Sequence, residues 1–413
     1  MKELLDVEDA RALLVHSLSA RAQAFERTSE RIAVATARGR ISAKRVATSV
    51  DVPVCATSAM DGYAVCSADP IWRGAPPHRA RVAGASRAGH PPTASLEPNT
   101  AMRIFTGAVL PAGSDAVVIQ ENTRAHGDGI DVDTTPEAGD WVREPGNDVK
   151  RGTQLIAAGH ELNAFDLARL TSCGVASIDV RPKLRVAIFS TGDELRDVGQ
   201  SLAPGDVYDS NRLVLRELLA KSAATVTDLG IVADDESRTV AMLESAAHDH
   251  DAILTSGGVS VGDADFVRRA LERVGKLEFW KLALRPGKPI AYGSIGACAF
   301  FGLPGNPVST IVTYLLIVKP ALAALAGAPE APPLRVSARA RVAIAHEPGR
   351  AEYQRGTYSI DNDGIHVQPT GDQGSNRIDS FTHANCLIEV PKENPGIPIG
   401  ARVQILPFDG LLS

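Results

Sequence analysis

The sequence has 413 residues, 44% of them hydrophobic and 22% charged, which is enough for two to four domains at roughly 150 residues each. Its formal charge of -6 at pH 7 predicts no general attraction to nucleic acid or to an anionic membrane, so an anionic ligand has to be held by local basic groups. No apolar run reaches the roughly 18 residues of a membrane span, the first residues (MKELLDVEDA) are acidic, and the five cysteines include no CxxC pair. We therefore expect a cytoplasmic protein without a signal peptide, zinc or iron-sulfur site, or disulfide framework.

The N-terminal segment, residues 3–49, is predicted to be mainly helical. Apolar residues recur at spacings of three and four in DVEDARALLVHSL, a second helical stretch is expected at residues 29–38, and an extended segment follows at 40–46. Residues 51–139 are rich in glycine, proline and valine and contain short apolar runs such as AVVIQ between turn signals. This composition predicts a small β domain inserted into the chain.

The segment after the insertion is more like the N-terminal segment than like the β domain. Asn163 is a suitable N-cap for a helix over AFDLARLTSC, and Gly174 is a suitable C-terminal stop. We therefore expect residues 1–50 and 140–180 to pack together as one elongated linker domain of helices and strands, with the β domain, 51–139, inserted between them.

Strands and helices alternate between residues 181 and 328. The expected strands are LRVAIF, TVTDLGIV, AILTS and AFFGL, and the expected helices are NRLVLRELLAKSAA, SRTVAMLESAAHDH, ADFVRRALERV and residues 308–326. This alternation predicts a doubly wound, mostly parallel α/β domain. Residues 329–413 contain short alternating segments with proline and glycine breaks, which predict a C-terminal β barrel.

Three loops rich in small residues follow predicted strands: STGDEL (190–195), GGVSVGDADF (257–266) and PGNPVS (304–309). The carboxyl ends of parallel strands meet at one edge of a sheet, and glycines there let a ligand approach the backbone. One such loop alone is typical of a simple turn, but three at one edge predict a phosphate-bearing ligand. The residues expected to bind it are Thr191, Gly192, Ser256, Gly257, Gly258, Ser260, Gly305 and Asn306.

Four acidic residues lie in the first two of these loops: Asp193, Glu194, Asp263 and Asp265. Carboxylates repel a bound phosphate unless a cation lies between them, and Mg²⁺ is commonly shared by carboxylates and ligand phosphates. The alternative is that these acids only stabilise helix N-termini. Glu194 and Asp265 are the predicted metal ligands, and for Asp263 both interpretations stay open.

The basic groups come from WKLALRPGKP, in which Lys281, Arg285 and Lys288 are spaced by four and three residues. In a helix these cations would form one solvated face. Pro286 and Pro289 favour an extended, rigid loop instead. We predict that this loop binds an oxyanion, with Arg285 placed for a bidentate contact.

Seven stretches, in order over nearly the whole chain, resemble the MoeA family of molybdopterin molybdenumtransferases, to which the E domain of gephyrin is also similar. They are SAMDGYAV (58–65), RIFTGAVLPAGSDAVVIQE (103–121), VREPGNDVKRG (142–152), FSTGDEL (189–195), TSGGVSVGDADF (255–266), FWKLALRPGKP (279–289) and GLPGNPVS (302–309). The resemblance implies a reaction in which adenylylated molybdopterin and molybdate give molybdenum cofactor and AMP, with magnesium or another divalent metal.

The resemblance also implies a homodimer of four-domain subunits, whose active site lies between the α/β domain of one subunit and the inserted β domain of the other. It implies molybdopterin adenylyltransferase and molybdoenzyme apoproteins as further partners, and neither nucleic acid nor membrane. Many relatives have a lysine where this chain has Arg285, which keeps the charge and changes the donor geometry. Carried over by position, the family's functional residues are Asp61, Asp148, Glu194, Asp234, Asp265, Pro304 and Pro307.

Two other functions are considered. A molybdopterin adenylyltransferase uses a similar α/β domain with a TSGG-type loop but is a single small domain, and a gephyrin-like scaffold binds receptor peptides. The additional regions and the retained acids of this chain favour the insertase over both. The residue types do not distinguish molybdate from tungstate as the substrate. They also leave open whether water or a molybdate oxygen attacks phosphorus. In the C-terminal region, Arg355 and residues 375–377 are candidate ligand contacts.

Overall fold

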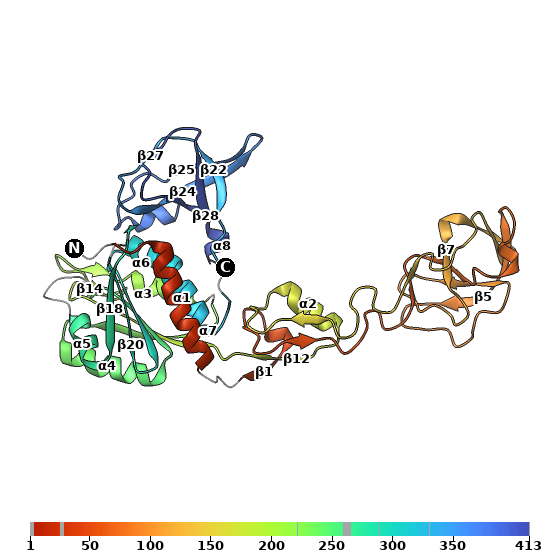
Figure 1. Ribbon diagram of the computed structural model, residues 1–413, viewed down its shortest axis with the longest axis horizontal. Coiled ribbons are helices and arrows are strands. Elements are labelled where there is room, and N and C mark those ends of the chain that lie inside the picture. The colour runs from red at the N-terminus through yellow and green to blue at the C-terminus, as the bar shows by residue number, and fades with distance from the viewer. Residues whose placement is uncertain are drawn as a thin grey trace.

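The computed structural model describes residues 4–24, 29–220, 222–258, 266–287, 289–329 and 331–412. The molecule is elongated: an α/β body and a C-terminal barrel lie at one end, a small β-sheet domain lies at the other, and a narrow linker joins them (Figure 1). This confirms the predicted multidomain architecture. The boundaries assigned to the four domains stay predictions.

The linker consists of two short sheets and a helix, built from both sides of the insertion. Its elements are β1 (Glu30–Ala33) paired with β12 (Ser177–Val180), β2 (Val46–Ala47) paired with β11 (Gln154–Ile156), and α2 (Ala164–Ser172). Asn163 caps α2 as predicted, because its side-chain oxygen accepts hydrogen bonds from the N–H groups of Phe165 and Asp166. The helix predicted at residues 29–38 is wrong. Strand β1 and a 3-10 turn (Val34–Thr36) take its place, since pairing with β12 satisfies this short segment's backbone.

Helix α1 (Val7–Ala24) packs with the α/β body and not with the linker. It lies against α7 (Lys319–Ala326), and its side chains Leu14 and Leu18 are fully buried there. The N-terminal segment is therefore divided: its first helix completes the core of the α/β body, and the residues from β1 onward build the linker.

The inserted part is a six-stranded sheet in the order β7-β4-β6-β5-β9-β8. Its strands are β4 (Gly62–Val65), β5 (His78–Ser86), β6 (Thr100–Ile104), β7 (Ala116–Ile119), β8 (Thr123–His126) and β9 (Gly129–Val132). The chain enters and leaves this sheet through β3 (Thr57–Ser58) and β10 (Val142–Arg143), which pair with each other. The predicted small β domain is thus confirmed.

The α/β body contains a six-stranded sheet in the order β16-β13-β17-β21-β20-β18. Its strands are β13 (Leu184–Thr191), β16 (Ala224–Val232), β17 (Ala252–Ser256), β18 (Lys276–Lys281), β20 (Pro289–Ile295) and β21 (Cys298–Leu303). Strands β13, β16, β17 and β21 run parallel to one another, as predicted. Strands β18 and β20 run antiparallel at one edge and were not predicted. A short parallel pair, β14 (Leu195–Arg196) and β15 (Val207–Tyr208), follows the loop after β13.

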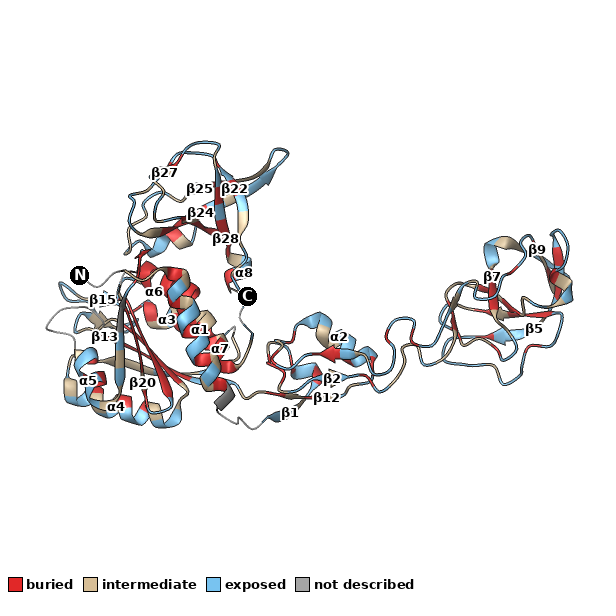
Figure 2. Cartoon of the chain, viewed as in Figure 1, coloured by how far each residue is buried: buried red, intermediate tan, exposed pale blue. Residues whose placement is uncertain are grey.

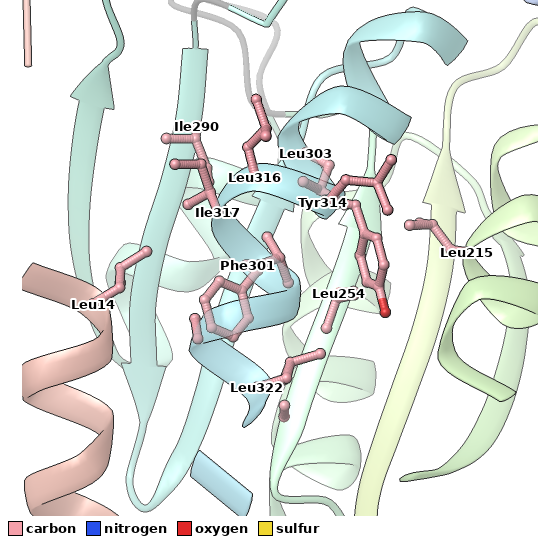
Figure 3. Packing of buried hydrophobic residues seen from close by; sticks show 14 of the residues in the cluster. Leu14, Leu215, Leu254, Ile290, Phe301, Leu303, Tyr314, Leu316, Ile317 and Leu322 are labelled. Atoms are coloured by element: carbon pink, nitrogen blue, oxygen red, sulfur yellow. The ribbon is translucent and has the colours of Figure 1, made fainter. Parts of the chain in front are cut away.

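Helices cover both faces of this sheet, which confirms the doubly wound fold. Helices α4 (Glu236–Asp249) and α5 (Phe266–Val274) bury one face, and α1, α3 (Asn211–Ala220), α6 (Pro307–Thr313) and α7 bury the other. The inner strands β13, β17, β20 and β21 are almost entirely buried, whereas the described side chains of the edge strands β16 and β18 are mostly exposed or partly exposed (Figure 2). On the second face, Leu254 and Phe301 of the sheet pack against Ile317 and Leu322 of the helical run after β21 (Figure 3).

The helical run Pro307–Ala326 joins α6, a π-helical segment (Tyr314–Val318) and α7. Its 20 residues are long and apolar enough to cross a membrane, so the expectation that no stretch has this length is wrong. Most of the run is buried inside the α/β body, where its side chains fill the core between the sheet and α1. Its apolar composition is therefore explained by burial in protein.

The C-terminal region is a closed barrel, because β24 pairs with both β25 and β26. Its strands are β22 (Val336–Ala340), β24 (Ala351–Asp361), β25 (Gly364–Pro369), β26 (Cys386–Val390) and β28 (Arg402–Pro407), with a side pair β23 (Ile344–Ala345) and β27 (Gly396–Ile397) and a last helix α8 (Phe408–Leu412). Strand β19 (Leu284–Arg285) of the α/β body pairs with β24 and joins the two units. The predicted barrel is confirmed.

Candidate functional site

The loops after β13, β17 and β21 meet at the carboxyl edge of the α/β sheet, as the sequence predicts. The Oγ atoms of Ser190 and Ser256 lie 3.0 Å apart, and the N–H of Gly257 donates to the carbonyl of Leu303 at 3.1 Å. These two contacts join the first loop to the second and the second to the third. A cavity of about 980 Å³ opens beside them, which is large enough for a nucleotide-sized ligand.

Most residues predicted to bind phosphate line this cavity. They are Thr191, Gly192, Ser256, Gly257, Gly258, Gly305 and Asn306. Gly257 has to be glycine, because its φ is +90° and a Cβ there would lie 2.7 Å from the carbonyl oxygen of Thr191. Its bare backbone therefore forms part of the cavity wall.

Carboxylates gather at one side of the cavity. Glu194 lines it, and its carboxylate folds so closely over Gly192 that a Cβ on this glycine would lie 2.6 Å from Oε2 of Glu194. Asp234, which follows β16, lines the same cavity, and its N–H donates to Oδ1 of Asp193 at 3.4 Å. The loops after β13 and β16 thus bring three acidic groups together.

This grouping has an electrostatic cost that a cation would remove. Partial burial raises the pKa of Asp234 above its ordinary value of 3.8, and the negative charges of Asp193 and Glu194 raise it further. Carboxylate oxygens suit Mg²⁺, although residues 4–258 and 266–412, with their gaps, contain no cluster of three His, Cys, Asp or Glu side chains arranged around one point. Ligand phosphate and water oxygens would complete the coordination of a metal held here.

The raised pKa of Asp234 predicts a specific pH dependence for stability. The folded state favours the protonated form, so the contribution of Asp234 is most favourable below 3.8 and is lost as the pH rises through the higher folded pKa. We expect Asp234→Asn to gain stability relative to the wild type as the pH rises from about 4 to 7. Urea denaturation of both proteins in metal-free buffer measures this difference, and a constant difference across the range contradicts it.

Arg285 is one of two cations among the described residues that line the cavity, together with Arg350 of the barrel. Arg285 ends the short strand β19, so the predicted extended conformation is observed up to this residue, and a bend begins at Pro286. The guanidinium of Arg285 is half exposed. The Nε atom lies 3.5 Å from Oε1 of the buried Glu352 in the barrel. A second carboxylate lies near the same guanidinium, with Oε2 of Glu347 4.0 Å from Nη1 of Arg285. The contact with Glu352 orients the side chain toward the cavity. Lys281, at the end of β18, does not line the cavity.

The C-terminal barrel supplies a further wall of the cavity, with Arg350, Asp372, Gln373, Gly374 and Ser375. The carbonyl of Ser375 accepts a hydrogen bond from the N–H of Val308 at 3.1 Å, which docks the barrel onto the start of α6. This contact occupies a backbone N–H in the first turn of α6, which is then not available to a ligand.

Arg355 was a candidate ligand contact, and its placement contradicts this. It is fully buried behind the barrel wall, where its guanidinium donates to Oγ of Ser380 at 2.8 Å and to the carbonyl of Gly374 at 3.1 Å. Burial lowers its pKa to about 10. Arg355 supports the wall through the backbone of Gly374 and does not line the cavity. Of the candidate residues 375–377, Ser375 alone lines it.

Two of the predicted functional acids lie far from this cavity in the same chain. Asp61 precedes β4 in the inserted sheet, at the opposite end of the molecule (Figure 1). Its Oδ1 accepts hydrogen bonds from the N–H and Oγ1 of Thr106 at 2.7 and 2.8 Å, which hold the pKa of Asp61 below its ordinary value. Asp148 is exposed beside the bridge between Val52 and Val149, where the insertion meets the linker.

Six other predicted site residues are two prolines, whose positions are described, and four residues that are not described. Pro304 lines the cavity, whereas Pro307 begins α6 just outside it. Ser260, Asp263, Asp265 and Lys288 lie outside the described residues.

Several cavity residues were missed by reasoning from the sequence. They are Asn211, Phe266, Ser309, Arg350, Asp372, Gln373 and Gly374. For the barrel loop a signal existed: GDQGS (371–375) has the same small-residue composition as the three α/β loops. For Asn211 the signal was its place at the start of a predicted helix beside the sheet edge.

Comparisons with known proteins cover almost the whole chain. Three family models match it: the MoeA N-terminal region (domains I and II) at residues 5–174, a probable molybdopterin-binding domain at 187–324, and the MoeA C-terminal region (domain IV) at 337–408. A molybdopterin molybdenumtransferase from Haemophilus influenzae is 38% identical over 99% of this chain and 100% of its own length. Gephyrin from Dictyostelium discoideum is 30% identical over 91% of this chain and 59% of its own length.

The same similarity extends to solved structures. A crystal structure of the molybdopterin biosynthesis MoeA protein from Pyrococcus horikoshii superimposes with a TM-score of 0.83 at 27% identity, covering 98% of this chain and 100% of that one. The fold and the order of the elements are therefore shared over full length.

Proposed function

The chain belongs to the MoeA family of molybdopterin molybdenumtransferases, and from this we propose that it inserts molybdate into adenylylated molybdopterin and releases AMP. The observation that carries the proposal is the cavity at the carboxyl edge of the sheet. It combines a glycine backbone with three carboxylates (Glu194, Asp234 and Asp372) and two arginines (Arg285 and Arg350) in a space large enough for a nucleotide-sized ligand.

In the proposed reaction an oxygen of water or of molybdate attacks phosphorus, and the phosphoanhydride bond of the adenylylated substrate breaks. AMP leaves, and the dithiolene sulfurs take up the molybdenum. The backbone of Gly257 and Gly258 would position the phosphates, and Arg285 would hold the molybdate as an oxyanion. Glu194 and Asp234 would hold a divalent cation, together with Asp265 if the predicted role of this residue is correct. Such a cation stabilises charge that develops on the phosphate oxygens.

We propose a homodimer in which the inserted domain of one subunit completes the cavity of the other. The support is geometric: Asp61 lies at the far end of its own chain, so it reaches a cavity of this kind only in a second copy (Figure 1). Asp148, at the root of the inserted domain, belongs to the same proposal. We place the reaction in the cytoplasm, because the cysteines of the chain are free thiols.

One assay tests the proposed reaction. Purified protein supplied with adenylylated molybdopterin, molybdate and Mg²⁺ should release AMP and produce cofactor that reconstitutes a molybdenum-free apoenzyme. A protein that instead consumes ATP with free molybdopterin is an adenylyltransferase, and one inert in both assays is a scaffold. Either of these two results refutes the proposed function.

A further inference from the structure

Asn211 joins two of the cavity loops across the sheet edge. It is the first residue of α3, is only 8% exposed and lines the cavity. Its Nδ2 donates to the carbonyl of Gly305 at 2.7 Å. The amide orientation follows from chemistry, since only the NH₂ group can face a carbonyl oxygen. No residue in this part of the chain was predicted to hold the PGNP loop.

The start of α3 is itself held rigidly. Asp209, whose side chain is 1% exposed, accepts hydrogen bonds at Oδ1 from the N–H groups of Asn211 and Arg212, at 3.1 and 3.2 Å. Arg212 pairs with Asp228 on β16 at 2.9 Å, with Asp209 at 3.3 Å and with Asp197. Asn211 therefore lies beside a partly buried ion-pair network that connects α3 to β16 and to the segment after β14.

The hydrogen bond to Gly305 sets the direction of the next peptide. The Gly305–Asn306 bond is trans, so its carbonyl and the N–H of Asn306 point in opposite directions. With the carbonyl fixed toward Asn211, the N–H of Asn306 points away from α3. Among the described residues this N–H has no hydrogen-bond partner, and Asn306 is exposed in the cavity.

We propose that Asn211 is a positioning residue: it locks the Gly305–Asn306 peptide so that the N–H of Asn306 donates to a phosphate oxygen of the bound nucleotide. The inference rests on the proposed function for the identity of the ligand. Its structural part, the orientation of the peptide, does not depend on that function. A free N–H that is oriented in advance binds an anion without the cost of turning the loop on binding.

The test uses Asn211→Asp, which has the same shape but places a second oxygen against the Gly305 carbonyl, and Asn211→Ser, which only withdraws the donor. In crystal structures of the full-length variants without ligand, the Gly305–Asn306 peptide should lose its wild-type orientation, with the Gly305 carbonyl no longer directed at residue 211. In the insertion assay, KM for adenylylated molybdopterin should rise about 10- to 100-fold while kcat changes less than about threefold. AMP binding, measured by calorimetry, should weaken in parallel. Arg216→Ala, on the exposed face of α3, should match the wild type in all three measurements.

The outcomes separate this inference from the proposed function. If the wild type releases no AMP, the proposed function fails, and the crystal structures of the variants still decide whether Asn211 orients the peptide. If the wild type is active and both variants keep its KM and its orientation of the Gly305–Asn306 peptide, the positioning role is refuted. Loss of the folded state in both variants, seen by circular dichroism, also refutes it, because Asn211 would then support global stability. A fall in kcat with unchanged KM contradicts the phosphate contact.

Discussion

Replacing Glu194 with glutamine is expected to lower magnesium-dependent AMP release by on the order of 100-fold. The substitution keeps the shape of the side chain and its close approach to Gly192. It removes one negative charge from the cluster of acidic side chains at the cavity. The cation would then bind more weakly, so higher Mg²⁺ should recover part of the lost rate. Initial rates of AMP release, measured over a range of Mg²⁺ concentrations, test this directly.

Glu217→Gln is the matched control, because Glu217 is an exposed acid on α3 that does not line the cavity. It should keep the wild-type rate and the wild-type dependence on Mg²⁺. If Glu194→Gln shows the same apparent affinity for Mg²⁺ as this control, Glu194 holds no metal, and the carboxylates at the cavity edge need another explanation.

Mixing two inactive variants is expected to restore activity if the site is shared between subunits. Asp61→Ala damages the inserted domain, and Glu194→Gln damages the α/β cavity. A hybrid dimer therefore contains one cleft with both defects and one with neither. Random exchange of subunits makes half of the dimers hybrids, so the recovered rate should approach roughly a quarter of the wild-type rate. AMP release measured after denaturing and refolding the mixed proteins gives the value.

The control mixture combines Glu194→Gln with Asp234→Ala, both in the α/β cavity. Every cleft in such a hybrid carries one defect, so no activity should return. Absence of recovery in the Asp61 mixture would place Asp61 in the site of its own subunit or outside the site altogether. Recovery in the control would show that restored activity does not report a cleft shared between subunits. The separation of Asp61 from the cavity within one chain argues for the shared arrangement (Figure 1).

The sequence predicted the cavity loops because their placement follows from local patterns. Buried parallel strands are recognisable as short apolar runs, and the loops after them meet at one edge whatever the details of the helices. The cap of α2 was predictable for the same reason, since Asn163 and its hydrogen-bond partners lie within one turn of chain. Thr191, Gly192 and Gly257 were thus expected at this edge from local sequence alone, and they line the cavity there.

Features that depend on distant pairing were not predictable in this way. Strand β1 is defined by β12, and the antiparallel edge strands β18 and β20 are defined by each other, so the local composition of these segments did not identify them. The barrel wall at Arg350 and Ser375 follows from docking of the barrel onto α6. Roles for Asp61 and Asp148 came from family resemblance alone, because nothing near them in the sequence indicates a ligand.

The most direct test of the account is a crystal structure of the protein with AMP and Mn²⁺, in which the anomalous signal of manganese locates the metal. The account predicts one manganese peak bound to Glu194, with the phosphate of AMP against the backbone of Gly257 and Gly258. Manganese and AMP bound together at any place other than the edge formed by the loops after β13, β17 and β21 would contradict it.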